Sequence, residues 1–294
     1  MAVMNESPYH ARLQRVLDHI DRNLDGDLDL ETLSGVAAFS PHHFHRQFSA
    51  LLGLSLGRYV QLARLKRAAS RLAYRPKDPI LQIALDCGYA GPEAFARAFR
   101  QRVGQSPSAF RRQPDWSPWH AAQAPLVQAR SKIMTHAFTD ADVRIIDFPE
   151  TPVARLSQHG DPAKLGDTIR RFIAWRREAG LPPRLSATFN ILPVDPETTE
   201  PGDYRLDLCA ATSLPVPDNP HGVVADRIPR GRCAVVRQTG SGDDLRPAAQ
   251  FLYADWLPRS GEELRDFPLF AQRVTFFPDV PEGEAVTDLF LPLR

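Results

Sequence analysis

The segment from Pro41 to Phe48 carries a dense group of hydrogen-bonding side chains at the start of a predicted helix. It reads Pro-His-His-Phe-His-Arg-Gln-Phe, and a helix that buries Phe44 and Phe48 turns the polar side chains outward. Such groups hydrogen-bond to base edges of DNA, and arginine can donate two bonds to one guanine. We therefore interpret the segment as a DNA recognition helix, with the candidate contacts His42, His43, His45, Arg46 and Gln47.

Two other interpretations of these histidines remain open. The imidazoles can form a solvated helix face, or they can contribute to a metal site, although His42 and His45 supply fewer ligands than zinc needs. The two phenylalanines are core residues under every interpretation.

A second segment, from Pro92 to Arg100, repeats this arrangement of phenylalanines and arginine. Arg97 matches Arg46, whereas Glu93 can accept a hydrogen bond from cytosine and repels phosphate. The arginines at the end of this segment and after it are better interpreted as phosphate contacts, which position a protein on DNA but do not recognise its sequence. They are Arg100, Arg102, Arg111 and Arg112. The candidate DNA contacts of this part are Pro92, Glu93, Ala96, Arg97, Arg100 and Arg111.

The elements that must position these side chains form a repeat with a displacement of 51 residues. Nine positions correspond, among them Phe44 with Phe95, Arg46 with Arg97 and Gly53 with Gly104. Each copy reads as a short helix, a tight turn and a second helix, which is the helix-turn-helix plan. A long basic helix over about 55–73 joins the copies, so two recognition helices can reach successive major-groove segments without a dimer.

The charge is divided along the chain, although the net charge is only +1. Residues 33–113 contain 13 Lys and Arg against 3 Asp and Glu, whereas residues 114–294 contain 20 against 25. A basic block beside an acidic one indicates a polyanionic partner for the first block only. Composition alone also allows a solvated basic helix face.

Several function classes find no support in the sequence. There is no apolar run of about 18 residues and no signal peptide at the start, so we expect a cytoplasmic protein. Cys87, Cys209 and Cys233 form no Cys-x-x-Cys pair and stand in apolar stretches, which predicts buried thiols in a reducing compartment. We expect no cofactor and no metal.

The second half of the chain also repeats, after an expected linker at 114–141 that begins with two prolines. Matching positions recur at a nearly constant displacement, as Gln158 with Gln238 and Trp175 with Trp256. Each copy reads strand, strand, helix, strand, strand. The first copy has predicted strands at 142–148, 153–159, 186–192 and 204–211 and a helix at 162–179. The second has strands at 223–228, 232–239, 269–277 and 285–291 and a helix at 243–257.

The predicted fold class is therefore an all-α double helix-turn-helix domain followed by an α+β domain of two modules related by a pseudo-twofold axis. A cleft between two such modules is a common place for a ligand.

On these residues, 9–113 resembles the DNA-binding domain of the AraC/XylS family of transcription regulators. The resemblance is carried by Ser40 to Phe48, by Arg64-Leu65-Lys66-Arg67-Ala68 and by Gly88-Tyr89 with Phe95, Arg97 and Phe99. The second recognition helix departs from the family, because Ala90-Gly91-Pro92-Glu93 lacks the small polar residues usual there.

Residues 142–294 resemble the GyrI-like effector domain of Rob-type regulators, through Asp147-Phe148-Pro149, Tyr204-Arg205-Leu206-Asp207 and Thr287-Asp288-Leu289-Phe290. The resemblance implies a cleft for a hydrophobic, often cationic, small molecule. Its candidate walls are Phe172, Trp175, Phe189, Tyr204, Trp256, Phe270 and Arg273, and the aromatics among them can also be core. The family often has a glutamate where this chain has Ala271, and Arg273 nearby favours a neutral or anionic ligand. Asp207 and Asp288 are either pocket acids or structural groups.

The resemblance implies a bacterial, sequence-specific DNA-binding transcription regulator whose second domain, 142–294, binds a small-molecule effector. Its expected partners are double-stranded DNA, an effector and RNA polymerase, and we do not expect an enzyme. Two alternatives remain: an enzyme of this fold that hydrolyses its ligand, or an architectural DNA-binding protein that needs no ligand. The sequence shows no nucleophile elbow, metal-ligand spacing or glycine-rich phosphate loop that would favour the enzyme.

Overall fold

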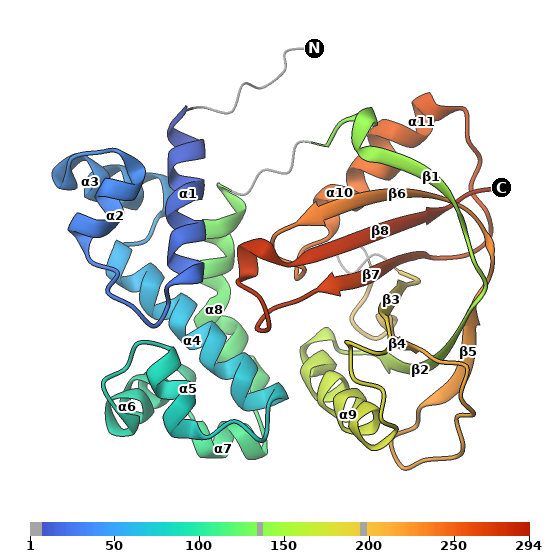
Figure 1. Cartoon of the computed structure of the whole chain (residues 1–294), viewed down its shortest axis with the longest axis horizontal. Coiled ribbons are helices and arrows are strands. Elements are labelled where there is room, and N and C mark those ends of the chain that lie inside the picture. The colour runs from blue at the N-terminus through green and yellow to red at the C-terminus, as the bar shows by residue number, and fades with distance from the viewer. Residues whose placement is uncertain (1–7, 134–137, 195–198) are drawn as a thin grey trace. The chain divides into compact units, whose positions relative to one another are not determined.

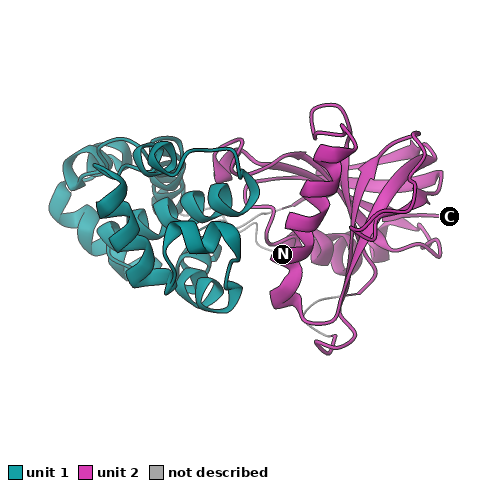
Figure 2. Ribbon diagram, turned by 90° about the horizontal axis from the view of Figure 1, so that it is seen from below, with its two compact units in different colours: residues 1–135 teal, residues 136–294 magenta. Residues whose placement is uncertain are grey.

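A computed structural model describes residues 8–133, 138–194 and 199–294. The chain divides into two compact units, residues 1–135 and 136–294, which Figure 2 colours separately. No helix of the described part is long and apolar enough to cross a membrane.

The first unit is entirely helical, as the sequence predicted. Its helices are α1 (Pro8–Arg22), α2 (Leu30–Ala37), α3 (Pro41–Leu52), α4 (Leu56–Tyr74), α5 (Ile80–Asp86), α6 (Pro92–Val103), α7 (Pro107–Arg112) and α8 (Trp116–Ser131). Serine side chains cap three of them: Ser40, Ser55 and Ser106 each accept a hydrogen bond from the backbone N–H three residues later. Proline follows Ser40 and Ser106 at the first helical position, where its missing N–H costs nothing.

Two hydrophobic cores lie along α4, one for each helix-turn-helix unit. Figure 1 shows α4 running from the side of α2 and α3 to the side of α5, α6 and α7. The first half of α4, to Ala63, packs with α1, α2 and α3. The second half, from Leu65, packs with α5, α6 and α7. One continuous helix therefore contributes to the cores that hold both α3 and α6.

The expected linker at 114–141 is for most of its length a helix, α8. Trp116 and Trp119 are buried in the second core, while Leu126 and Ala129 are buried in the first. The prolines that suggested a linker are tolerated here, because Pro114 precedes the capping residue Asp115 and Pro118 lies in the first turn. Helix α8 thus belongs to the first unit.

The two tight turns differ in length. Ala38, after α2, has a φ of 54°, and Gly88, after α5, has a φ of 69°. The range 39–40 separates Ala38 from α3, whereas the range 89–91 separates Gly88 from α6, so the second turn is longer by one residue. Ala37 and Gly88, which the displacement of 51 residues aligns, are therefore not structural equivalents.

The second unit is built on one eight-stranded antiparallel sheet with the order β1-β6-β8-β7-β3-β4-β2-β5. The strands are β1 (Val143–Phe148), β2 (Thr151–His159), β3 (Thr188–Leu192), β4 (Arg205–Ala211), β5 (Val224–Ile228), β6 (Gly231–Thr239), β7 (Leu269–Thr275) and β8 (Val286–Pro292). Helix α9 (Leu165–Glu178) serves the first repeat, and α10 (Arg246–Gln250), the π-helical turn η3 (Phe251–Trp256) and α11 (Leu257–Ser260) serve the second. The predicted α+β fold class is confirmed.

The repeats exchange their first strands: β1 pairs with β6 of the second repeat, and β5 pairs with β2 of the first. When every strand is replaced by its equivalent in the other repeat, the result is the same strand order read from the opposite edge of the sheet. At the centre, β3 pairs with β7 so that Asn190 faces Ala271, its own counterpart in the second repeat. The pseudo-twofold axis passes through this pair.

The two faces of the sheet have different cores. Helix α9 covers β2 and β4 through Phe172 and Trp175, and η3 covers the second repeat through Leu252 and Trp256. The opposite face has a cluster of phenylalanines in which Phe270 stacks on Phe290 at 4.7 Å between ring centroids. Alternation along each strand assigns neighbouring residues to different faces.

Candidate DNA-binding and effector sites

Helix α3 presents its polar side chains as a group because two phenylalanines fix its rotation. Phe44 and Phe48 are 0% exposed, and their ring centroids lie 5.6 Å apart. The side chains on the other side of the helix are exposed, namely His42, His43, His45 and Arg46, while Gln47 is half-buried. Within the described residues, no three histidine, cysteine, aspartate or glutamate side chains gather as metal ligands would.

Helix α6 is held in the same way by Phe95 and Phe99, which are 0% exposed. Glu93, Arg97 and Arg100 are exposed, and Pro92 and Ala96 are half-buried. The helix begins after Gly91 without a side-chain cap, in contrast to the serine cap of α3.

The basic side chains of the first unit divide into free and engaged groups. Arg46, Arg97 and Arg100 form no hydrogen bond or ion pair with any described residue. Arg111, by contrast, donates from Nη2 to the carbonyl of Asp78 at 2.7 Å, and burial lowers the pKa of its guanidinium. Its position in the fold ties α7 to the loop after α4.

Two arginines of the basic helix α4 hold the unit together. Arg64 donates to the carbonyls of Leu24 at 2.9 Å and Gly26 at 2.8 Å. Arg71 pairs with Asp78 at 2.8 Å and Asp86 at 2.5 Å, and these carboxylates raise the pKa of its guanidinium against the opposing effect of burial. These two arginines of α4 are therefore engaged within the unit.

In the second unit, the predicted effector residues do not form one group. Phe172 and Trp175 stack beneath α9, with centroids 5.9 Å apart, and Trp256 lies in the core of the other repeat. Phe189 and Phe270 belong to the core on the opposite face of the sheet. Tyr204 is buried before β4, and burial raises the pKa of its hydroxyl.

Arg273 stands on the helix-bearing face beside the pseudo-twofold axis. Its Nε donates to Oδ1 of Asn190 at 2.9 Å, and Nη1 donates to the carbonyl of Gly242 at 2.6 Å. It forms no ion pair with a described residue. Burial lowers the pKa of this guanidinium, and the charge of Asp243 partly offsets that effect. Arg273 is thus a cation held by neutral oxygens.

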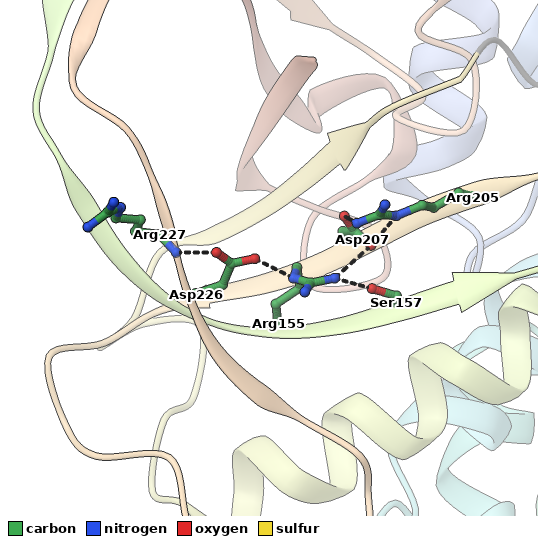
Figure 3. Close-up of polar contacts among 6 residues, drawn as sticks. All are labelled: Arg155, Ser157, Arg205, Asp207, Asp226 and Arg227. Atoms are coloured by element: carbon green, nitrogen blue, oxygen red, sulfur yellow. Dashed lines mark hydrogen bonds and ion pairs between the residues drawn. The ribbon is translucent and has the colours of Figure 1, made fainter. Parts of the chain in front are cut away.

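The matched aspartates Asp207 and Asp288 are partners of arginines. Asp288 accepts from Arg237 at 2.6 and 2.7 Å. Asp207 accepts from Arg205 at 2.8 Å and lies 3.5 Å from Arg155, as Figure 3 shows. The geometry favours the structural interpretation of both groups.

Sequence reasoning missed Arg176, which is 5% exposed. It donates to the carbonyls of Leu181 and Ser186 at 2.7 Å each and to Oγ1 of Thr188 at 2.6 Å, and burial lowers its pKa to about 10. The signal was its position one turn after Phe172, on the buried side of α9.

The three cysteines are buried thiols, as predicted. Burial raises the pKa of Cys87 and of Cys233 to about 11 in each case, and it also raises the pKa of Cys209. Such thiols carry little of the nucleophilic thiolate form near neutral pH.

Comparisons with known proteins agree with this organisation. The profile of the GyrI-like small molecule binding domain matches residues 141–294, and a helix-turn-helix domain profile matches 33–113. The probable transcriptional regulator YgiV of Escherichia coli K12 is 40% identical over 153 residues, which are 52% of this chain and 96% of that protein. The right origin-binding protein of the same organism is 27% identical over 146 residues, 50% of this chain and 47% of that protein.

Among solved structures, the crystal structure of the EcmrR C-terminal domain aligns with a TM-score of 0.42 at 18% identity, covering 52% of this chain and 96% of that one. Together, the family matches and the regulator relatives identify the family and the function of the chain. The chain belongs to the GyrI-like small molecule binding domain family, carries an AraC-type helix-turn-helix domain before it, and is a DNA-binding transcription regulator with an effector-binding domain.

Proposed function

We propose that α3 and α6 are the two recognition helices and enter successive major-groove segments of one operator. The observation that carries this proposal is the equivalent exposure of Arg46 and Arg97, each held outward by a pair of fully buried phenylalanines. The proposed contacts are His42, His43, His45, Arg46 and Gln47 on α3, and Pro92, Glu93, Ala96, Arg97 and Arg100 on α6. Arg111 supports α7 and can reach phosphate only with its remaining donors.

We further propose that the effector binds on the helix-bearing face of the second unit, where the repeats meet. Phe172, Trp175 and Trp256 lie on that face, as does Arg273. Phe189 and Phe270 support it from the other side of the sheet. A guanidinium held only by neutral oxygens favours an effector that is neutral or carries an anionic group.

The regulator then works by linkage. An effector changes transcription only if it binds the active and inactive states with different affinity. The proposed readout is the affinity for the operator or the contact with RNA polymerase. The names of the relatives describe regulation and origin binding, which supports binding rather than turnover as the activity of this chain.

Selection of binding sites from random duplex DNA, with the whole protein at near-physiological salt, tests the proposal. We expect a motif of two half-sites separated by about one helical turn. If binding falls steeply with salt and no motif emerges, the first unit is a non-specific clamp and the two-reader proposal is wrong.

A further inference from the structure

The ladder between β2 and β5 stops before β2 ends. Val224, the first residue of β5, faces Arg155 in the terminal pair of the ladder, whereas β2 continues to His159. In a continued ladder, Gly222 would face Ser157. Gly222 instead has a φ of +71°, a value that favours glycine, and the chain turns away from β2.

The loop that turns away is held rigidly by Asn219. Its side-chain Oδ1 accepts from the N–H of Val223 at 3.1 Å, and Nδ2 donates to the carbonyls of Val223 at 2.8 Å and Pro217 at 2.9 Å. A pocket of about 410 Å³ remains between this loop, the free edge of β2 and α9.

Backbone donors of β2 point into this pocket. The carbonyl of Pro152 accepts from Thr212, and the N–H of Gly160 donates to Tyr204, so the even-numbered residues of β2 turn towards β4. Ser157 and His159 therefore turn their N–H groups to the other side, where β5 no longer supplies carbonyls. The carbonyl of His159 already accepts from Nε2 of Gln158 at 3.0 Å. The carbonyl of Ser157 faces the same side, so this edge of β2 offers two N–H donors and one carbonyl that have no partner in the ladder with β5.

The charged groups of the lining are cations or imidazoles: Arg155, Arg171, His159 and His221. Arg171 is exposed on α9 and forms no ion pair or hydrogen bond with a described residue. Nε2 of His221 lies 2.9 Å from Glu178, whose side chain is 67% exposed.

The charge of Arg155 is already compensated. Asp226 lies 2.5 Å and Asp207 3.5 Å from it, and Figure 3 shows this group on the face of β2 turned away from α9. Arg171 is the uncompensated cation of the lining, and no carboxylate is among the described residues that line the pocket.

We propose that this pocket binds a small anion through Arg171 and the N–H groups of Ser157 and His159. The shared chemistry is a carboxylate or phosphate group, because both accept several charge-assisted hydrogen bonds at once. The pocket belongs to one repeat only, since the counterparts of Arg171 and His159 in the second repeat are Leu252 and Thr239. The proposal goes beyond the DNA and effector sites and does not depend on them.

Titration calorimetry of the full chain with inorganic phosphate and with succinate tests the proposal and separates its two chemistries. Succinamide serves as the neutral analogue of succinate. We expect saturable binding of one anion per chain and none of succinamide. Arg171→Gln should weaken binding at least about tenfold, because it removes a charge-assisted bidentate donor.

Arg177→Gln is the matched control, because Arg177 is exposed on the same helix but does not line the pocket. It should leave the affinity within about twofold of the parent. His159→Asn keeps the backbone N–H that the proposal uses, so it should leave the affinity within about twofold of the parent. The proposal is overturned if neither anion binds saturably, if succinamide binds as well as succinate, or if both arginine variants bind like the parent.

Discussion

Arg46 and Arg97 are exposed at equivalent places on two helices whose rotation is fixed by buried phenylalanines. Because arginine reads guanine through two donors, Arg46→Ala should cost about 1–3 kcal/mol of binding free energy at one base position. Competition between the selected operator and its single-base variants measures this cost.

Arg100→Ala is the comparison for that measurement, since Arg100 is an exposed arginine further along α6. As a phosphate contact it should weaken binding to all sequences alike and reduce the salt slope by about one. An equal loss on every sequence for Arg46→Ala would make Arg46 a phosphate contact as well.

Gly88 permits a contact that joins the two helix-turn-helix units. A Cβ at this position would overlap with Nη2 of Arg64, whose guanidinium is already bonded to Leu24 and Gly26. Gly88→Ala should therefore lower the free energy of unfolding by roughly 1–2 kcal/mol, because a Cβ disfavours the left-handed backbone conformation. The displaced hydrogen bonds of Arg64 should lower it by about 1 kcal/mol or more in addition. Urea unfolding of the full chain measures the sum.

Gly104→Ala separates the two contributions. Gly104 has a φ of +79°, but nothing described lies within 4 Å of a Cβ placed there. It should show the backbone cost alone. Equal losses for the two variants would mean that the approach of Arg64 to Gly88 contributes nothing to stability.

At the scale of elements, repeats were the most reliable guide in the sequence. The internal repeat of the second unit predicted each of its described strands, because two copies of one pattern must share their boundaries. Helix α8 has no second copy in the sequence, and its prolines led to the prediction of a linker despite its apolar residues. The alternation of side chains along a strand places Phe189 and Asn190 on opposite faces of the sheet, but the sequence does not indicate which of these faces the helices cover. The predicted effector residues were consequently placed together although they lie on two faces.

Helix α8 is anchored by a buried ion pair. Arg130 donates to both carboxylate oxygens of Asp21 in α1, at 2.5 and 2.9 Å, and the two side chains are 7% and 5% exposed. Arg130→Ala should destabilise the unit by about 3–5 kcal/mol, because it leaves a buried carboxylate without this cation. Chemical unfolding of the whole protein gives this number.

The double variant Arg130→Leu with Asp21→Leu should recover part of the loss, since neither charge of the pair is left buried. Gln128→Ala, on the exposed side of the same helix, should change stability by less than about 0.5 kcal/mol. A loss for Arg130→Ala as small as this would show that α8 is only loosely attached.

For the whole molecule, the question is where the DNA-binding unit ends. Residues 1–113 contain both helix-turn-helix motifs but lack α8, which supplies Trp116 and Trp119 to one core and Leu126 and Ala129 to the other. A fragment of residues 1–135 should unfold cooperatively. The fragment 1–113 should not, because exposing two core faces and the carboxylate of Asp21 removes more than the about 5–15 kcal/mol that holds a typical domain together. Thermal unfolding followed by circular dichroism compares them. Equal midpoints would restore 114–141 as a linker and make α8 dispensable for the fold.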